Sequence, residues 1–246
     1  MSRLSLEWQR LYAVVPAAGE AAAPGRVRAA VLELARPADW AALSAVWQGV
    51  QADLGLPAPG IAVNGRDGYQ LWFSLRQPVP AAQALAFVQA LGARYLGDTL
   101  PGRLSLWPGA GDRLAPAMVP AVVGDGGPWS AFVAPDLAPV FTDEPWLDTP
   151  PNEQGQAELL ARLGSASADA FERAVQRLPG AAAPVAAAAP AAPAAPAAST
   201  APATAAHRDP QRFLLEVMND DRVDLALRIE AAKALLAYGP RSGPAG

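Results

Sequence analysis

The chain has 246 residues, a formal net charge of −4 and an isoelectric point near 5.0, with no cysteine and one histidine. The lack of cysteine excludes disulfides, redox thiol pairs and a cysteine nucleophile. With a single histidine as well, the usual zinc-binding sites are excluded. The negative net charge argues against a generally basic protein that coats nucleic acid. It does not exclude a local basic patch.

The start of the chain, MSRLSLEWQRLY, lacks the continuous apolar run of a signal peptide. No window approaches the roughly 18 apolar residues of a membrane span without a charge or a proline-rich break. We therefore expect a cytoplasmic protein with no membrane partner.

A change of composition marks the main domain boundary. Residues 179–207 consist mostly of alanine and proline and include the lone His207. Such a segment buries too little apolar surface to offset its ordering entropy, and its prolines block a helix. This predicts a disordered linker between an α+β domain at 1–178 and a small helical module at 208–240. Residues 241–246 are expected to form a disordered tail.

Period-two and period-3.6 hydrophobic patterns alternate through the large domain. The predicted core strands are residues 27–35, 60–63, 69–75 and 103–107. One predicted helix begins at residues 37–39 and carries an apolar stripe from Trp40 to Leu54; the other begins after Pro80 and carries one from Ala84 to Tyr95. Beyond this core we expect strands near 118–123 and 129–133 and helices at 152–163 and 167–178.

The element order is β-α-β-β-α-β, which is that of ferredoxin-like and RRM-like domains. We therefore predict an α+β fold with both core helices on one face of a four-stranded antiparallel sheet. Strand residues alternate between faces, so the other face can be derived from the sequence. It is expected to collect Glu33, Gln70, Trp72, Ser74, Arg103, Ser105 and Trp107.

Two interpretations of this face are open. Two tryptophans and an arginine on an exposed sheet are typical of a platform on which nucleic-acid bases stack. Alternatively, the many apolar residues after the fourth strand cover the face, and the tryptophans belong to a core.

The segments GIAVNGRDGYQLWFSLRQPVPAAQALAFVQALG and RLSLWPGAGDRLAPAMVPAVVGDGGPWSAFVAPDLAPVF carry a resemblance. Over about residues 27–141 the chain resembles archaeo-eukaryotic-type primase-polymerase domains, whose core is itself RRM-like. The resemblance implies an acidic pair on the first strand for divalent metals and a nucleotide-contacting histidine on the third. Here the first position keeps only Glu33 and the second holds Gln70, which implies a degenerate domain with no catalytic residue, metal site or cofactor.

The C-terminal module has helical spacing on both sides of a break at residues 219–221. It resembles a short helical segment of phage-associated proteins, including small terminase-like ones. The spacing predicts a helical hairpin that either docks on a partner or self-associates. Its apolar interaction positions are Phe213, Leu214, Val217, Met218, Leu225, Ile229 and Leu236.

Three functions follow from these patterns. The first is a non-catalytic protein associated with nucleic acid or replication, which binds single-stranded nucleic acid. The second is a protein–protein interaction adaptor that uses the tethered C-terminal helices. The third is a metal-dependent nucleotidyltransferase, which would need a divalent metal at Glu33.

Overall fold

The computed structural model describes residues 1–14, 25–97, 99, 101–109, 117–178 and 180. Within them the fold is α+β, as predicted, with a five-stranded antiparallel sheet in the order β4-β1-β3-β2-β5. The strands are β1 (Arg26–Ala35), β2 (Gly60–Val63), β3 (Gly68–Pro80), β4 (Leu104–Trp107) and β5 (Ala131–Val133). The first four have the predicted βαββαβ topology, and β5 extends the sheet beyond β2.

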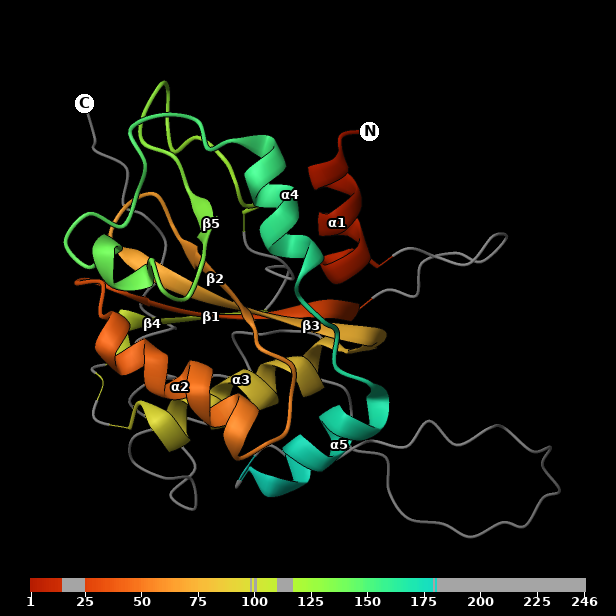
Figure 1. Cartoon of the computed structure of the whole chain (residues 1–246). Coiled ribbons are helices and arrows are strands. Elements are labelled where there is room, and N and C mark those ends of the chain that lie inside the picture. The colour runs from red at the N-terminus through yellow and green to blue at the C-terminus, as the bar shows by residue number, and fades with distance from the viewer. Residues whose placement is uncertain (15–24, 98, 100, 110–116, 179, 181–246) are drawn as a thin grey trace, which may run out of the picture. The chain divides into compact units, whose positions relative to one another are not determined.

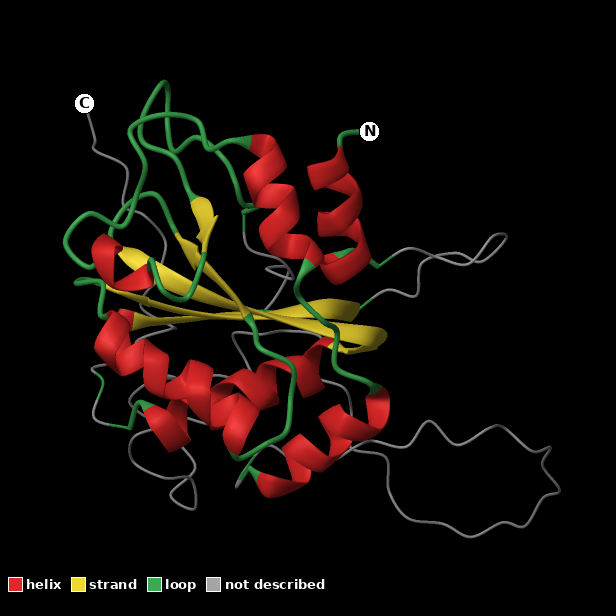
Figure 2. Ribbon diagram, viewed as in Figure 1, coloured by secondary structure: helices red, strands yellow, loops and turns green. Residues whose placement is uncertain are grey.

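Helices cover both faces of this sheet (Figure 1, Figure 2). They are α1 (Arg3–Tyr12), α2 (Trp40–Ala52), α3 (Ala81–Tyr95), α4 (Glu153–Ala161) and α5 (Ala168–Arg177), with short 3₁₀ turns η1 (Pro101–Arg103) and η2 (Ala138–Phe141). Three of them, α2, α3 and α5, lie on one face, and α1 and α4 lie side by side on the other. The sequence predicted all of these helices except α1.

The pairing of β1 with β3 forms the centre of the sheet. Their register places Glu33 opposite Gln70 and Val31 opposite Trp72, and it shifts between Val27 and Ala29. Beyond the shift, Arg26 and Val27 at the start of β1 pair with Pro80 and Val79 at the end of β3. This pairing explains why β3 continues to Pro80, five residues beyond the predicted strand.

The turn between β2 and β3 is built around Asn64. Its Oδ1 accepts hydrogen bonds from the backbone N–H groups of Arg66, Asp67 and Gly68 at 2.9–3.0 Å. Gly65 has φ +78°, a conformation that favours glycine. Asn64 and Gly65 thus form the turn, and its geometry determines the register of the hairpin.

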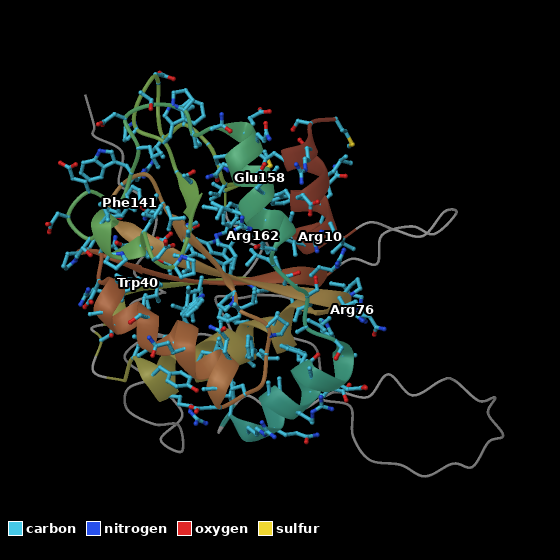
Figure 3. All side chains as sticks on the ribbon, viewed as in Figure 1. Arg10, Trp40, Arg76, Phe141, Glu158 and Arg162 are labelled. Carbon is cyan, nitrogen blue, oxygen red and sulfur yellow. The ribbon has the colours of Figure 1, made fainter. Side chains whose placement is uncertain are left out.

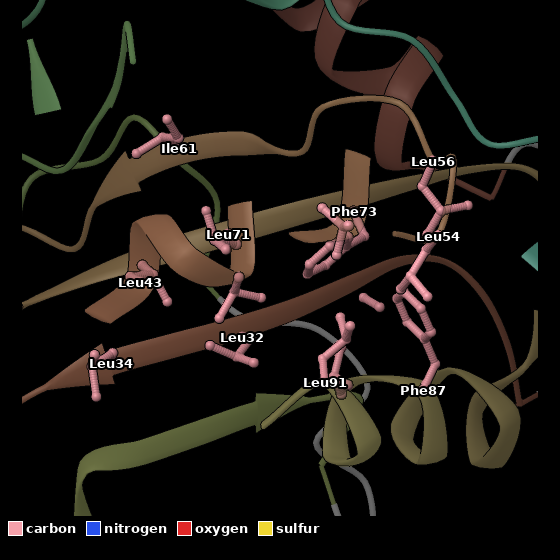
Figure 4. Packing of buried hydrophobic residues seen from close by; sticks show 14 of the residues in the cluster. Leu32, Leu34, Leu43, Leu54, Leu56, Ile61, Leu71, Phe73, Phe87 and Leu91 are labelled. Carbon is pink, nitrogen blue, oxygen red and sulfur yellow. The ribbon is translucent and has the colours of Figure 1, made fainter. Parts of the chain in front are cut away.

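The larger core lies between the sheet and α2, α3 and α5 (Figure 4). Leu32 and Leu34 of β1 and Leu71 and Phe73 of β3 point from the sheet toward the helices, as the alternation of the strands predicted. Phe87 of α3 makes edge-on contacts with Phe73 and Phe171 at centroid distances of 5.4 and 5.1 Å. The last contact fastens α5 to this core.

Side chains at their N-termini cap four of the helices. Asp39 caps α2 and Asn152 caps α4, each accepting a backbone N–H bond at 2.8–2.9 Å. Ser167 caps α5 in the same way, and Ser2 caps α1. These caps satisfy donors that a helix leaves unpaired, so they help to determine where these four helices begin.

Two arginines hold α1 and α4 by their C-terminal ends. Arg10 donates to the carbonyls of Leu160 and Leu163, just where α4 ends. Arg28 of β1 donates to the carbonyls of Arg10 and Ala13 at the end of α1, and to that of Leu75. A cation at a helix C-terminus satisfies free carbonyls and interacts favourably with the helix dipole.

The region before β5 differs from the prediction. Residues 118–123 do not form a strand, and only Val122 makes an isolated bridge, to Trp129. Pro120 and Pro128 lack the N–H groups that a longer ladder would need, which explains the short pairing. The predicted strand at 129–133 is confirmed only for its last three residues, which form β5.

The outer edge of β5 is closed by one side chain. Gln156 of α4 accepts a hydrogen bond from the Phe132 N–H at 2.8 Å and donates one to the Phe132 carbonyl at 2.9 Å. Its amide thus takes the place of a neighbouring strand. Gln156 is 6% exposed, so these backbone groups have little access to water.

We predict that Gln156→Ala lowers the free energy of unfolding by about 2–4 kcal/mol, because it leaves two buried backbone groups unpaired. Urea denaturation measures the change. The matched control is Gln154→Ala on the exposed side of the same helix, for which a change below about 0.5 kcal/mol is expected. Equal effects of the two substitutions would contradict the role given to Gln156.

Candidate functional site

The predicted face residues form two rows across the sheet, on the side away from α2 and α3. The pairing register aligns Gln70, Glu33 and Ser105 in one row and Trp72, Val31 and Trp107 in the next. The alternation of the strands therefore predicted correctly which of these side chains share a face.

The centre of this face is covered. Trp72 is 1% exposed, and the neighbouring Gln70 and Ser74 are 6% and 8% exposed. The covering helices are α1 and α4, so Trp72 is not available to stack on a base in this arrangement. The interpretation of the face as an exposed platform is therefore wrong for these three residues. The alternative, a cover formed by later residues, holds for α4.

An aromatic cluster of Trp8, Tyr12, Trp72 and Phe132 fills the space between the sheet and α1. Tyr12 lies 5.1 Å from the Trp72 ring and stacks on Phe132 at 6.1 Å with an interplanar angle of 8°. Trp8 contacts Trp72 edge-on. Sequence reasoning missed α1, although Leu4, Trp8, Leu11 and Tyr12 have the spacing of one helical stripe and Ser2 is a good cap.

Burial perturbs the polar atoms of this cluster. Within the described residues, neither the Tyr12 hydroxyl nor the Trp8 indole nitrogen has a hydrogen-bond partner. Burial raises the pKa of Tyr12 well above its ordinary value, and the charge of the nearby Arg10 acts in the opposite direction. Tyr12 therefore stays neutral and serves as a packing residue.

Ser74 connects the sheet to the end of α1. Its Oγ donates to the Leu11 carbonyl at 2.7 Å and lies 2.7 Å from the Ser165 Oγ. The side chain is thus bound on both sides by the chain's own groups, which gives it a structural role on this face.

Arg103 is not part of the face. It lies in η1, one residue before β4, and its guanidinium donates to the carbonyls of Ala35 and Pro37. It also lies 3.8 Å from the Asp39 carboxylate. The predicted strand began one residue too early, and Arg103 instead holds the turn that leads from β1 to α2.

Glu33 is the only carboxylate among the predicted face residues, and it is tied to its neighbours. The Gln70 amide donates to its Oε2 at 2.6 Å, and the Trp72 indole N–H donates to the Gln70 Oε1 at 2.9 Å. The resulting chain, Trp72 to Gln70 to Glu33, leads from the aromatic cluster to the less buried side of the face. It fixes the amide orientation of Gln70, since each end of that amide has a partner of opposite kind.

Burial also sets the electrostatics of Glu33. Desolvation raises the pKa of its carboxyl, while hydrogen bonds with Gln70 and Asn64 act in the opposite direction. The Asp67 charge adds to the rise, and the Arg36 charge reduces it. The carboxylate form of Glu33 is therefore held at an energetic disadvantage in the folded protein.

The remaining part of the face lies along β4. Ser105 and Trp107 are half-buried, and among the described strands β1 alone pairs with β4. In the part of the chain that the structure describes, no group of three or more Asp, Glu, His or Cys side chains gathers as a metal site would require. The predicted interaction helices, from Phe213 to Leu236, lie outside the described residues.

Comparison of the sequence with known protein families gives no match. Comparison with curated proteins gives no match either. The resemblance to primase-polymerase domains and the resemblance of the C-terminal segment to phage proteins therefore both stay predictions. Among the described helices, none is long and apolar enough to cross a membrane.

The raised pKa of Glu33 has a consequence for stability. The folded state binds a proton at Glu33 more readily than the unfolded chain does, so ionisation of this group favours unfolding. Its contribution is most favourable below the unfolded pKa and is lost as the pH rises through the higher folded pKa.

We predict that Glu33→Gln stabilises the protein relative to wild type increasingly as the pH rises from about 4 to about 8. Urea denaturation across this range measures the difference in free energy of unfolding. Glu158→Gln, at an exposed position of α4, is the control and should show no such trend. Wild type gaining stability over Glu33→Gln with rising pH would contradict the account.

Proposed function

We propose that the protein is a non-catalytic interaction adaptor whose C-terminal segment, residues 208–240, captures a protein partner. The observation that carries the proposal is the closed sheet face. Aromatic side chains of α1 and aliphatic side chains of α4 cover the surface that a base-stacking platform would expose. An adaptor needs a stable scaffold and a separate contact segment. The domain described here would serve as that scaffold.

The contacts of Glu33 support a role in binding over catalysis. Two-metal phosphoryl transfer needs several carboxylates that converge on the ions. At this position the chain offers Glu33, which already accepts a hydrogen bond from Gln70. Where the resemblance implies a histidine, Gln70 itself is fixed between Glu33 and Trp72.

The sequence of the C-terminal segment supports the choice of a protein partner. Its apolar positions repeat at helical spacing on both sides of residues 219–221, and about 30 residues are too few to bury such stripes in a core of their own. Apolar anchors at helical spacing are typical of helices that lie in a partner's groove. The segment carries six acidic and five basic residues, a formal net charge of −1, which does not favour nucleic acid.

Single-stranded nucleic acid is the second candidate partner. The observation in its favour is Trp107, which is half-buried and lies on β4 in the same row as Trp72. One partly exposed tryptophan offers a surface for a single base, whereas the platform expected from the sequence had two tryptophans and an arginine.

We predict that Leu214→Asp and Leu225→Asp, each made in the full chain, abolish capture of a partner that the wild type enriches. A charge within an apolar stripe would have to be buried without a counter-charge. Affinity purification from the cells that encode the protein, with quantitative mass spectrometry, measures the enrichment. Glu216→Gln is the control within the same segment and should retain the partner.

Two outcomes would contradict the adaptor function. One is an identical set of partners for the wild type and both aspartate variants. The other is salt-sensitive binding of a single-stranded oligonucleotide by the full chain that Trp107→Ala removes, since this would favour the nucleic-acid partner.

A further inference from the structure

A pocket of about 240 Å³ opens at the junction between α2, α4 and the β2–β5 edge of the sheet. We call it the α4–β5 pocket. This volume exceeds the ~150 Å³ of an apolar cavity that accommodates benzene, so the pocket is large enough for a small organic molecule. It lies apart from the row of Glu33, Gln70 and Ser105, none of which lines it.

The walls of the pocket are apolar. They include the side chains of Trp47, Ile61, Phe132, Leu160 and Leu163. Aromatic and aliphatic walls of this kind favour a ligand with an apolar body, and they disfavour one whose polar atoms would lose water without gaining a partner.

Polar groups of the wall are already used within the protein. The Trp47 indole N–H donates to the Pro59 carbonyl, and the Ala134 carbonyl accepts from two backbone N–H groups. The carbonyls of Leu160 and Leu163 accept from Arg10. A nucleobase, which carries several donors and acceptors on its ring, would find few partners here.

Two opposite charges also line the pocket, Asp136 after β5 and Arg162 at the end of α4. Within the described residues neither side chain forms an ion pair or a hydrogen bond, and both are exposed. Figure 3 shows Arg162 at the end of α4 that approaches the sheet. The pocket therefore combines an apolar interior with one cationic and one anionic group.

We propose that the α4–β5 pocket binds a free α-amino acid with an aromatic or branched apolar side chain. The side chain of the ligand occupies the apolar interior, its carboxylate accepts hydrogen bonds from the Arg162 guanidinium, and its ammonium donates to the Asp136 carboxylate. A free amino acid carries both charges on one carbon, whereas a peptide terminus carries only one of them. This ligand thus matches the charge and the apolarity of the pocket together.

The test uses L-phenylalanine as the probe and the full chain, with binding measured by isothermal titration calorimetry. Arg162→Gln and Asp136→Asn should each weaken binding by up to about fivefold, the effect expected for one exposed charge contact. Arg76→Gln and Asp125→Asn, which change exposed residues outside the pocket, are the matched controls and should leave binding unchanged.

Analogues separate the two charge contacts. Phenethylamine lacks the carboxylate, so its weaker binding should not respond to Arg162→Gln. The anion 3-phenylpropionate lacks the ammonium, so Asp136→Asn should not weaken its binding. Glycine carries the charged groups without the apolar body and should not bind measurably.

A substitution that fills the pocket tests the apolar contact. Ala134→Leu should abolish binding of L-phenylalanine, while Ala161→Leu, on the exposed side of α4, should not. A thermal melt checks that both variants fold, and Ala58→Leu replaces Ala134→Leu if that variant unfolds. The proposal is overturned if L-phenylalanine shows no saturable binding at millimolar concentration, or if its binding survives the pocket and charge substitutions unchanged.

Discussion

The two-sided burial of the β1–β3 pair is the constraint on which the rest of the structure depends. Alternate residues of these strands are apolar on both faces, so Leu32 and Leu71 need one cover while Val31 and Trp72 need another. The βαββαβ unit supplies only the first cover, through α2 and α3. The second comes from segments outside that unit, α1 before it and α4 after it, and this is what closes the face.

The second cover is held by polar contacts at its margins and by aromatic packing at its centre. Arg10 and Arg28 bind the C-terminal carbonyls of α4 and α1, and Gln156 closes the free edge of β5. Because the aromatic cluster fills the space beneath these helices, the polar residues that remain on the face lie toward β4. Helix α4 of this cover also forms one wall of the α4–β5 pocket. The packing that buries the second sheet face therefore also shapes the pocket.

Local patterns sufficed to predict most of the fold. The strands β1, β2 and β3, the helices α2 and α3 and the caps at Asp39 and Ser167 all follow from alternation, spacing and turn residues near in sequence. The sequence also predicts correctly which side chains of β1 and β3 point toward α2 and α3, because side chains alternate between the two faces of a strand. A shift of one residue would have exchanged the two faces.

The candidate site could be predicted only in part, because its accessibility depends on contacts distant in sequence. The alternation of β3 shows that Trp72 points away from α2 and α3, yet it cannot show that residues 3–12 pack on it. Arg103 was misplaced because a strand end shifts easily by one residue, and its hydrogen bonds to the Ala35 and Pro37 carbonyls decide the local structure.

The central claim, that the second face of the sheet is a closed core, can be tested by one thiol-labelling measurement, since the wild-type chain has no cysteine. Ala62 of β2 is 0% exposed beneath this cover, whereas Ala161 of α4 is exposed. The account predicts that Ala62→Cys reacts with a thiol reagent about a hundredfold or more slowly than Ala161→Cys under native conditions, and equally fast in denaturant. Equal reaction rates under native conditions would contradict it.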